Sequence, residues 1–190
     1  MKLTVSLGYD PDTESPCEYD GQWKLYSFNS RHINFKHPDN FIKSVNEFGE
    51  IVPVNIGLAR KLAVGTAFFL SYFEHGNCVW SLKGHGPQCR WDTTQIAGIL
   101  VWEHSPDDMG AKSYKDREKD AEAFLQEYTN WCNGQCFCYC IRDEKGEAID
   151  FCGGYIGHDY LLECMKSEHP QLFDKNNEVV VTGDAAWIME

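Results

Sequence analysis

Three carboxylates in a loop near the N-terminus are the first residues whose types and spacing suggest metal chemistry. Asp10, Asp12 and Glu14 alternate with other residues there. Oxygen ligands at the first, third and fifth positions are how the Ca²⁺-binding loop of an EF-hand begins. That loop also needs a glycine at its sixth position and a glutamate at its twelfth, where this chain has Ser15 and Gly21. The segment therefore predicts a solvated acidic turn. The alternative is a Mg²⁺ or Ca²⁺ ion bound by the three carboxylates, with Asp20 or Asp92 folded alongside to complete the oxygen ligands.

The segment Cys89–Gln95, of sequence CRWDTTQ, is the second candidate. An aspartate followed by hydroxyl-bearing residues commonly forms an Asx or ST turn. We therefore expect Asp92 and Gln95 to hydrogen-bond the loop backbone and to fix the start of the strand that follows. The functional alternative is that Arg90, Trp91, Asp92 and Gln95 belong to a binding site.

Cys89 also allows nucleophilic chemistry, because a thiol becomes a nucleophile when a base or a cation activates it. His75 and His85 are the histidines nearest to it in the sequence. Sequence alone does not place either imidazole beside the thiol. A Cys–His pair is therefore an alternative to a cysteine that only fills space in the fold.

The charge of the chain limits the partners it can have. Its 190 residues include 17 Lys and Arg against 29 Asp and Glu, which gives a net charge of −12. A chain this acidic is not expected to bind nucleic acid or an anionic membrane directly. It can bind a basic partner, including the basic groove of a nucleic-acid-binding protein. The simpler interpretation is that the charge serves solubility.

The distribution of apolar residues bears on where the protein works. No apolar run reaches the ~18 residues that a transmembrane helix requires. The N-terminal sequence MKLTVSLGYD has too short an apolar stretch for a signal peptide and predicts a first strand instead. We therefore expect a cytoplasmic protein whose nine cysteines are reduced.

An apolar hairpin at residues 68–83 is the element around which the candidate residues must be positioned. Large apolar side chains alternate on both sides of a short loop. The pattern predicts that Leu70 faces Leu82 and that Tyr72 faces Trp80, because a one-residue slip would give a poorer apolar face.

The remaining elements follow from hydrophobic periodicity and from capping signals. Further strands are predicted at Lys2–Tyr9, Gln22–Asn29, Ile96–Trp102, Gln135–Arg142, Ala148–Tyr155 and Glu178–Thr182, of which Ile96–Trp102 is apolar on both faces and should be central. Helices are predicted at Asn40–Phe48, at Val54–Val64, between Ser113 and Gly134, and at Asp159–His169. This order predicts a single α+β domain over residues 1–190, with a largely antiparallel sheet built from two hairpins and a few packed helices.

Three segments of the chain resemble a widespread family of uncharacterised proteins encoded by bacteriophages and other mobile elements. The first, ESPCEYD at 14–20, is similar to the family's ESP-x-E-W-D segment. The second, CRWDTTQIAG at 89–98, is similar to its C-x-W-D-S-G-Q-x-G segment. The third is the C-terminal order of helix, hairpin and Gly-aromatic-Ile-Gly, the last at 154–157. The chain departs from the family pattern at Tyr19 and Thr94, where the family has Trp and Gly.

The resemblance implies a genomic setting more than a mechanism, and its first two segments contain the candidate binding residues. Those residues are Glu14, Asp20, Arg90, Trp91, Asp92 and Gln95. We favour a small acidic phage accessory protein that acts in the host cytoplasm by binding rather than by catalysis, without a cofactor. Its expected partner is a host protein such as a nucleic-acid-binding defence complex. The chain would then inhibit a CRISPR or restriction system, as an anti-CRISPR or antirestriction protein does. An acidic surface can block a basic channel electrostatically.

Two alternatives remain open. One is a metal-dependent hydrolase or nucleotide-processing enzyme, because two-metal chemistry needs clustered carboxylates. Its candidate carboxylates are Asp10, Asp12, Glu14, Asp20 and Asp92. The other is a sponge for a nucleotide signal, in which aromatic rings stack on the base and a cation binds the phosphate. Its candidate residues are Trp80, Trp91, Trp102 and Arg90.

Overall fold

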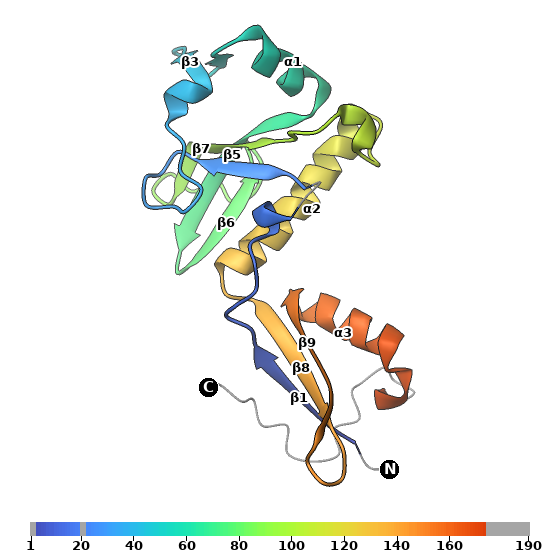
Figure 1. Cartoon of the computed structure of the whole chain (residues 1–190). Coiled ribbons are helices and arrows are strands. Elements are labelled where there is room, and N and C mark those ends of the chain that lie inside the picture. The colour runs from blue at the N-terminus through green and yellow to red at the C-terminus, as the bar shows by residue number, and fades with distance from the viewer. Residues whose placement is uncertain (1–2, 20–21, 174–190) are drawn as a thin grey trace. The chain divides into compact units, whose positions relative to one another are not determined.

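The chain forms two compact units (Figure 1). The computed structural model describes residues 3–19 and 22–173. The central unit is Pro16–Thr129, and the terminal unit joins Met1–Ser15 to Asn130–Glu190. Helices combine with antiparallel sheets in the chain, so the predicted α+β class is confirmed, although the two predicted hairpins lie in separate sheets. The sequence predicted a single domain over residues 1–190, and it did not predict this division into two units.

A four-stranded antiparallel sheet is the framework of the central unit (Figure 1). In spatial order its strands are β2 (Lys24–Ser27), β7 (Thr93–Val101), β5 (Ala67–His75) and β6 (Asn77–Leu82). Leu70 faces Leu82 and Tyr72 faces Trp80, so the predicted register of the hairpin is confirmed. Strand β7 lies between β2 and β5, which confirms its predicted central position.

Helix α2 (Tyr114–Cys132) is the longest helix of the described chain and begins as the sequence predicts. The Ser113 amide donates to Asp116 Oδ2 at 3.3 Å, and the Asp116 amide donates to Ser113 Oγ at 3.1 Å, which forms a reciprocal cap. Its buried side chains are Ala121, Phe124, Leu125, Tyr128 and Thr129. Thr129 Oγ1 accepts a hydrogen bond from the Trp80 amide at 3.0 Å, so the helix covers part of the outer edge of β6.

The predicted helix Asn40–Phe48 is wrong. The segment and the residues that follow it form η2 (Pro38–Asn40), β3 (Ile42–Val45) and β4 (Ile51–Pro53), and the two strands pair as a ribbon. Asn46 Oδ1 accepts hydrogen bonds from the amides of Phe48 at 3.0 Å and Glu50 at 2.9 Å, which closes the turn between the strands. The side chain of Phe48 is 82% exposed rather than buried on a helical face. The apolar spacing that suggested a helix therefore belongs to a ribbon whose turn is specified by Asn46.

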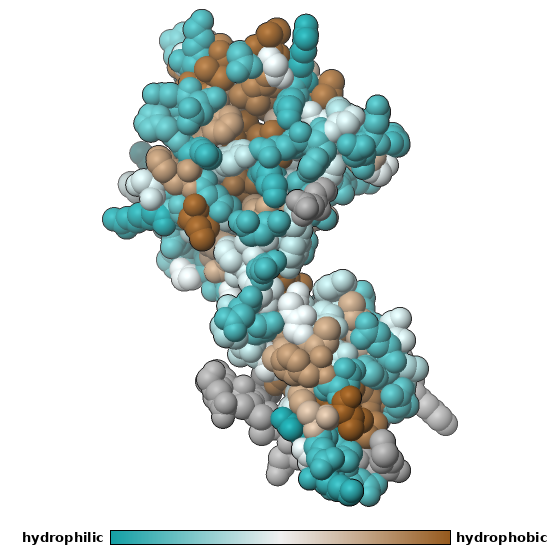
Figure 2. Space-filling view, in the orientation of Figure 1, coloured by the Kyte–Doolittle hydropathy of each residue, from teal (hydrophilic) through white to brown (hydrophobic). Residues whose placement is uncertain are grey.

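Helix α1 (Ile56–Val64) follows the ribbon as predicted. Asn55 Oδ1 accepts from the Leu58 amide at 2.9 Å and caps the first turn, and Gly65 ends the helix at φ 75°. Several apolar side chains stay exposed here, among them Val52 and Ile56. Figure 2 shows hydrophobic atoms among the polar ones over the part of the central unit that carries β3 and α1. The short segments η1 (Pro16–Glu18) and η3 (Pro106–Asp108) complete this unit.

The terminal unit is a three-stranded antiparallel sheet packed against one helix. Its strands, in spatial order, are β1 (Thr4–Tyr9), β8 (Cys136–Arg142) and β9 (Ala148–Ile156), followed by α3 (His158–Glu168) and η4 (Pro170–Leu172). The first strand, the second hairpin and the last helix are confirmed. Buried side chains of β8 and α3, such as Tyr139, Ile141, Leu161 and Met165, form its core. The strand predicted at Glu178–Thr182 lies outside the described residues.

The described part of the chain contains no helix that is both long enough and apolar enough to cross a membrane.

We expect Gly98→Ala to destabilise the central unit. A Cβ at this position of β7 would lie 2.5 Å from the carbonyl oxygen of Tyr26 in β2. The neighbouring backbone must shift, which should lower the free energy of unfolding by roughly 1–3 kcal/mol. The matched control is Gly110→Ala, where a Cβ would meet nothing within 4 Å. Urea denaturation measures both variants, and equal midpoints would contradict the close approach of β2 and β7.

Candidate functional site

The segment Cys89–Gln95 forms a hydrogen-bonded turn that leads into β7. Thr93 Oγ1 accepts from the Cys89 amide at 2.9 Å and donates to the Pro87 carbonyl oxygen at 3.0 Å. The Thr93 amide donates to the Cys89 carbonyl oxygen at 3.1 Å. Thr93 is therefore the residue that closes the turn, whereas the sequence pointed to Asp92 and Gln95 for this role.

Asp92 lies beside Cys89 and His75, two of the three residues that were considered for a nucleophilic pair. Its Oδ2 accepts from Cys89 Sγ at 3.1 Å and lies 3.6 Å from His75 Nδ1. A carboxylate gives a thiol no positive neighbour, and thiolates form beside cations or accepting bases. The other candidate base, His85, places Nδ1 2.8 Å from Glu122 Oε1. The contact of the Cys89 thiol with Asp92 thus helps to fix the turn. The thiol donates to a carboxylate there, which is not the contact of a nucleophile with an activating histidine.

Arg90 and Trp91 project from this turn. The Trp91 side chain is 83% exposed, although tryptophan has a large apolar surface. The guanidinium carbon of Arg90 lies 5.1 Å from the centroid of the Trp91 ring, which is the geometry of a cation–π contact. Gln95 donates from Nε2 to Gln88 Oε1 at 2.9 Å. The turn therefore presents an aromatic–guanidinium pair, which we call the Arg90–Trp91 pair, on a fixed backbone.

The acidic loop at residues 10–14 is held by hydrogen bonds from backbone amides to the Asp10 carboxylate. Asp10 Oδ1 accepts from the Asp12 amide at 3.2 Å, and Oδ2 accepts from the Gly154 amide at 2.7 Å. Gly153 leaves room for this carboxylate, because a Cβ there would lie 2.5 Å from Asp10 Oδ2. Asp12 and Glu14 are exposed. Within residues 3–19 and 22–173, no three His, Cys, Asp or Glu side chains are grouped so that they could hold a metal ion.

The sequence-predicted site residues are divided between the two units. Asp10, Asp12 and Glu14 belong to the terminal unit, and residues 89–95 belong to the central unit. Asp20 lies outside the described residues. Within one unit, the structure brings Arg90, Trp91 and Asp92 together on a single turn.

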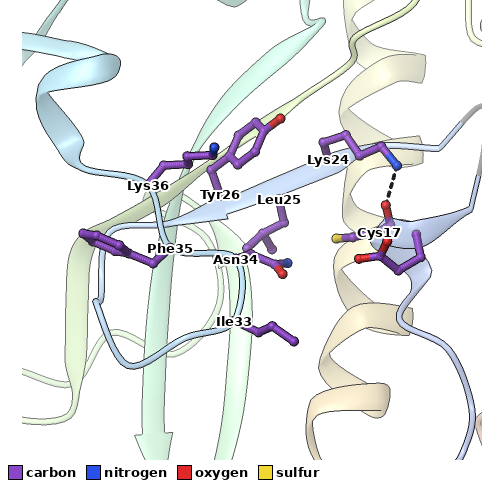
Figure 3. Close-up of a pocket in the computed structure, with 9 residues that line it drawn as sticks. Cys17, Lys24, Leu25, Tyr26, Ile33, Asn34, Phe35 and Lys36 are labelled. Carbon is purple, nitrogen blue, oxygen red and sulfur yellow. Dashed lines mark hydrogen bonds between the residues drawn. The ribbon is translucent and has the colours of Figure 1, made fainter.

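A cavity beside β2 was missed by the sequence analysis (Figure 3). It measures about 310 Å³, and its lining includes Lys24, Tyr26, Asn34 and Lys36. Lys24 Nζ donates to the carbonyl oxygen of Cys17, and Lys36 Nζ lies 5.8 Å from the centroid of the Tyr26 ring. Figure 3 shows the two lysines directed toward these different partners. The signal for this cavity in the sequence is a local excess of basic residues. Because the two lysines have different partners, their ammonium groups do not converge on one anion.

The hydroxyl of Tyr26 at this cavity is also engaged. It donates to Glu103 Oε1. Burial, together with this hydrogen bond and the negative charge of Glu103, raises the pKa of Tyr26 to about 12. The phenol is therefore neutral at physiological pH, and it serves as a donor within the protein.

The aromatic residues considered for nucleotide stacking differ in their accessibility. Trp80 is 4% exposed and Trp102 is 6% exposed, so both belong to the core. Trp80 packs edge-on against His32 with ring centroids 5.5 Å apart, beside a cavity of about 200 Å³. Burial lowers the pKa of His32, whose Nδ1 lies 2.8 Å from Ser27 Oγ. Of the three tryptophans proposed for stacking, Trp91 is the one with an open ring.

Comparison of the sequence with protein-family models and with curated proteins gave no match, and comparison with solved structures gave none.

We expect Thr93→Val to open the turn that carries the Arg90–Trp91 pair. The substitution keeps the β-branched shape but removes the hydroxyl that binds the Cys89 amide and the Pro87 carbonyl oxygen. It should lower the free energy of unfolding by about 1–2 kcal/mol in urea denaturation. Thr94→Val is the matched control, because Thr94 is exposed on the same strand. An equal loss in the two variants would contradict the role of Thr93 in the turn.

Proposed function

We propose that this chain is a phage accessory protein that inhibits a host defence system by binding one of its protein components. The Arg90–Trp91 pair is the proposed contact surface. The observation that carries the proposal is a tryptophan that is 83% exposed on a turn closed by the Thr93 hydroxyl. The resemblance of CRWDTTQIAG at 89–98 to a segment of phage-encoded proteins supports the setting.

The residue types of the pair support a role in protein recognition. Tryptophan and arginine are the residues most enriched among those that dominate binding energy at protein interfaces. Trp91 offers a large rigid apolar surface, and Arg90 adds donors for carboxylate or carbonyl groups at the edge of that surface. Because Thr93 fixes the backbone, less conformational entropy is lost on binding than for a mobile loop.

The charge distribution supports a basic partner. The terminal unit contains five Lys and Arg and 14 Asp and Glu, a net charge of −9 of the total −12. Complementary charge speeds association and selects partners. A protein that binds nucleic acid has the basic surface that such a unit would attract, which supports a CRISPR-type or restriction-type complex as the target. Opposite charge would also let the chain exclude the nucleic acid from that surface.

The two alternative functions have less support from the side-chain contacts. A carboxylate-based hydrolase would need clustered carboxylates, and in the described residues (3–19 and 22–173) no three His, Cys, Asp or Glu side chains are grouped to hold a metal ion. A nucleotide sponge would need an open aromatic ring for stacking, and Trp80 and Trp102, two of its three candidate tryptophans, are buried. Arg90 and Trp91 supply one cation and one ring. Both alternatives therefore remain proposals of second rank.

We expect Trp91→Ala to abolish protection of phage in defence-bearing cells. The test is a plaque assay on host cells that carry the defence system. Cells that express the chain should support plaques at an efficiency at least tenfold above cells that lack the chain. Trp91→Ala should remove this gain, because loss of one dominant interface residue costs roughly 2–4 kcal/mol of binding free energy.

Phe48→Ala is the matched control for this assay, because Phe48 is also a strongly exposed aromatic residue at a turn of the central unit. It should leave protection intact at equal expression. Absence of protection by the unaltered chain against representative CRISPR and restriction systems would refute the proposed function. Equal loss in both variants would refute the role of Trp91.

A further inference from the structure

The terminal unit contains a cavity that the proposed binding function does not use. It measures about 320 Å³, at the small end of the range for ligand sites. Its lining comes from the end of β1 and the residues after it, from Trp131, and from Cys136 at the start of β8. Figure 1 shows the end of β1 beside the start of β8, where Tyr9 pairs with Phe137.

Two aromatic rings form walls of this cavity. Tyr9 stacks on Phe137 with ring centroids 5.3 Å apart, and its side chain is still 51% exposed. Trp131 donates from its indole Nε1 to the Thr13 carbonyl oxygen at 2.9 Å, which fixes the orientation of the indole. Pro11 adds a further apolar surface. The rings are thus held in place by contacts within the unit.

A carboxylate is held at the same cavity. The backbone amide of Asp10 donates to the Cys136 carbonyl oxygen at 2.9 Å, which ties the residue to β8. The Asp10 carboxylate accepts the amides of Asp12 and Gly154, and each of its oxygens has a second lone pair for a further donor. Gly154 has φ 83°, a conformation that favours glycine, so the amide that orients the carboxylate depends on this residue.

We propose that this cavity binds a guanidinium group, as in the arginine side chain of a partner. A guanidinium stacks on aromatic faces and donates to carboxylates with a planar set of N–H groups. Tyr9 and Trp131 provide the faces, and Asp10 provides the acceptor. The net charge of −9 on the terminal unit raises the local concentration of cations. The cavity is in a different unit from the Arg90–Trp91 pair, so the inference does not rest on the function proposed above.

NMR titration of the full chain with N-acetyl-L-arginine amide tests the proposal. The ligand should shift the indole N–H signal of Trp131, assigned with Trp131→Phe, and the amide signal of Gly154. N-acetyl-L-citrulline amide has nearly the same shape without the charge, and it should shift neither signal. Asp10→Asn should weaken binding of the arginine compound by roughly tenfold or more, because a charge-assisted hydrogen bond becomes a neutral one.

A second variant keeps the test decisive if Asp10→Asn unfolds the terminal unit. Tyr9→Leu removes one aromatic wall at the end of β1 and should weaken binding several-fold through loss of the cation–π contact. Tyr160→Leu is its matched control, because Tyr160 is a 57% exposed tyrosine of α3 that does not line the cavity, and it should leave binding unchanged. The proposal is overturned if the Trp131 signal does not move, if the citrulline compound moves it equally, or if Tyr9→Leu binds like the unaltered chain.

Discussion

The backbone of β7 is paired on both sides over residues 98–101 and with β5 alone at Thr93 and Thr94, and this pairing determines what the central unit can present. A central strand must satisfy its amide and carbonyl groups with two neighbours, because water cannot reach them. Gly98 allows β2 to come close on one side, and Leu70 of β5 pairs with it on the other. Because Thr93 and Thr94 pair with Phe73 and Tyr72 of β5, the turn at the first residue of β7 has a base that is anchored to the sheet. Trp91 is exposed on that base, and its ring contacts the Arg90 guanidinium rather than the core of the unit.

Part of the fold could be predicted because the alternation of apolar residues in the hairpin favours a single register. The register that pairs Tyr72 with Trp80 follows from matching large side chains on one face. The same kind of pattern misled at Asn40–Phe48, where apolar residues at helical spacing belong to a two-stranded ribbon. The segment forms a turn at Asn46 instead of a helix, because the Asn46 side chain accepts hydrogen bonds from nearby amides that a helix would need. The pairing of β1 with β8 and of β2 with β7 joins residues far apart in the chain and places the two hairpins in separate sheets. Pairing over such distances leaves no signal in the local sequence.

The candidate site could be predicted only as a segment. The types of residue at Cys89–Gln95 indicated a turn before a strand, and the structure contains that turn. The exposure of Trp91 was not predictable, because tryptophan is highly buried on average. The contact between Cys89 Sγ and Asp92 Oδ2 depends on how the turn closes, as does the distance from Asp92 to His75. For the same reason, nothing in the sequence brought Asp10 toward Gly154, which lies far away in the chain and supplies the amide that holds its carboxylate.

Site-specific photocrosslinking in host cells tests most directly whether the exposed Trp91 meets a partner. A photoreactive phenylalanine analogue would replace Trp91 in one experiment and Phe48 in the other, in cells that carry a defence system which the chain inhibits. If the Arg90–Trp91 pair is the contact surface, the first position should give one crosslinked host protein, a component of that system, and the second should not give it. No crosslink at position 91, or the same products from both positions, would contradict a binding function carried by this turn.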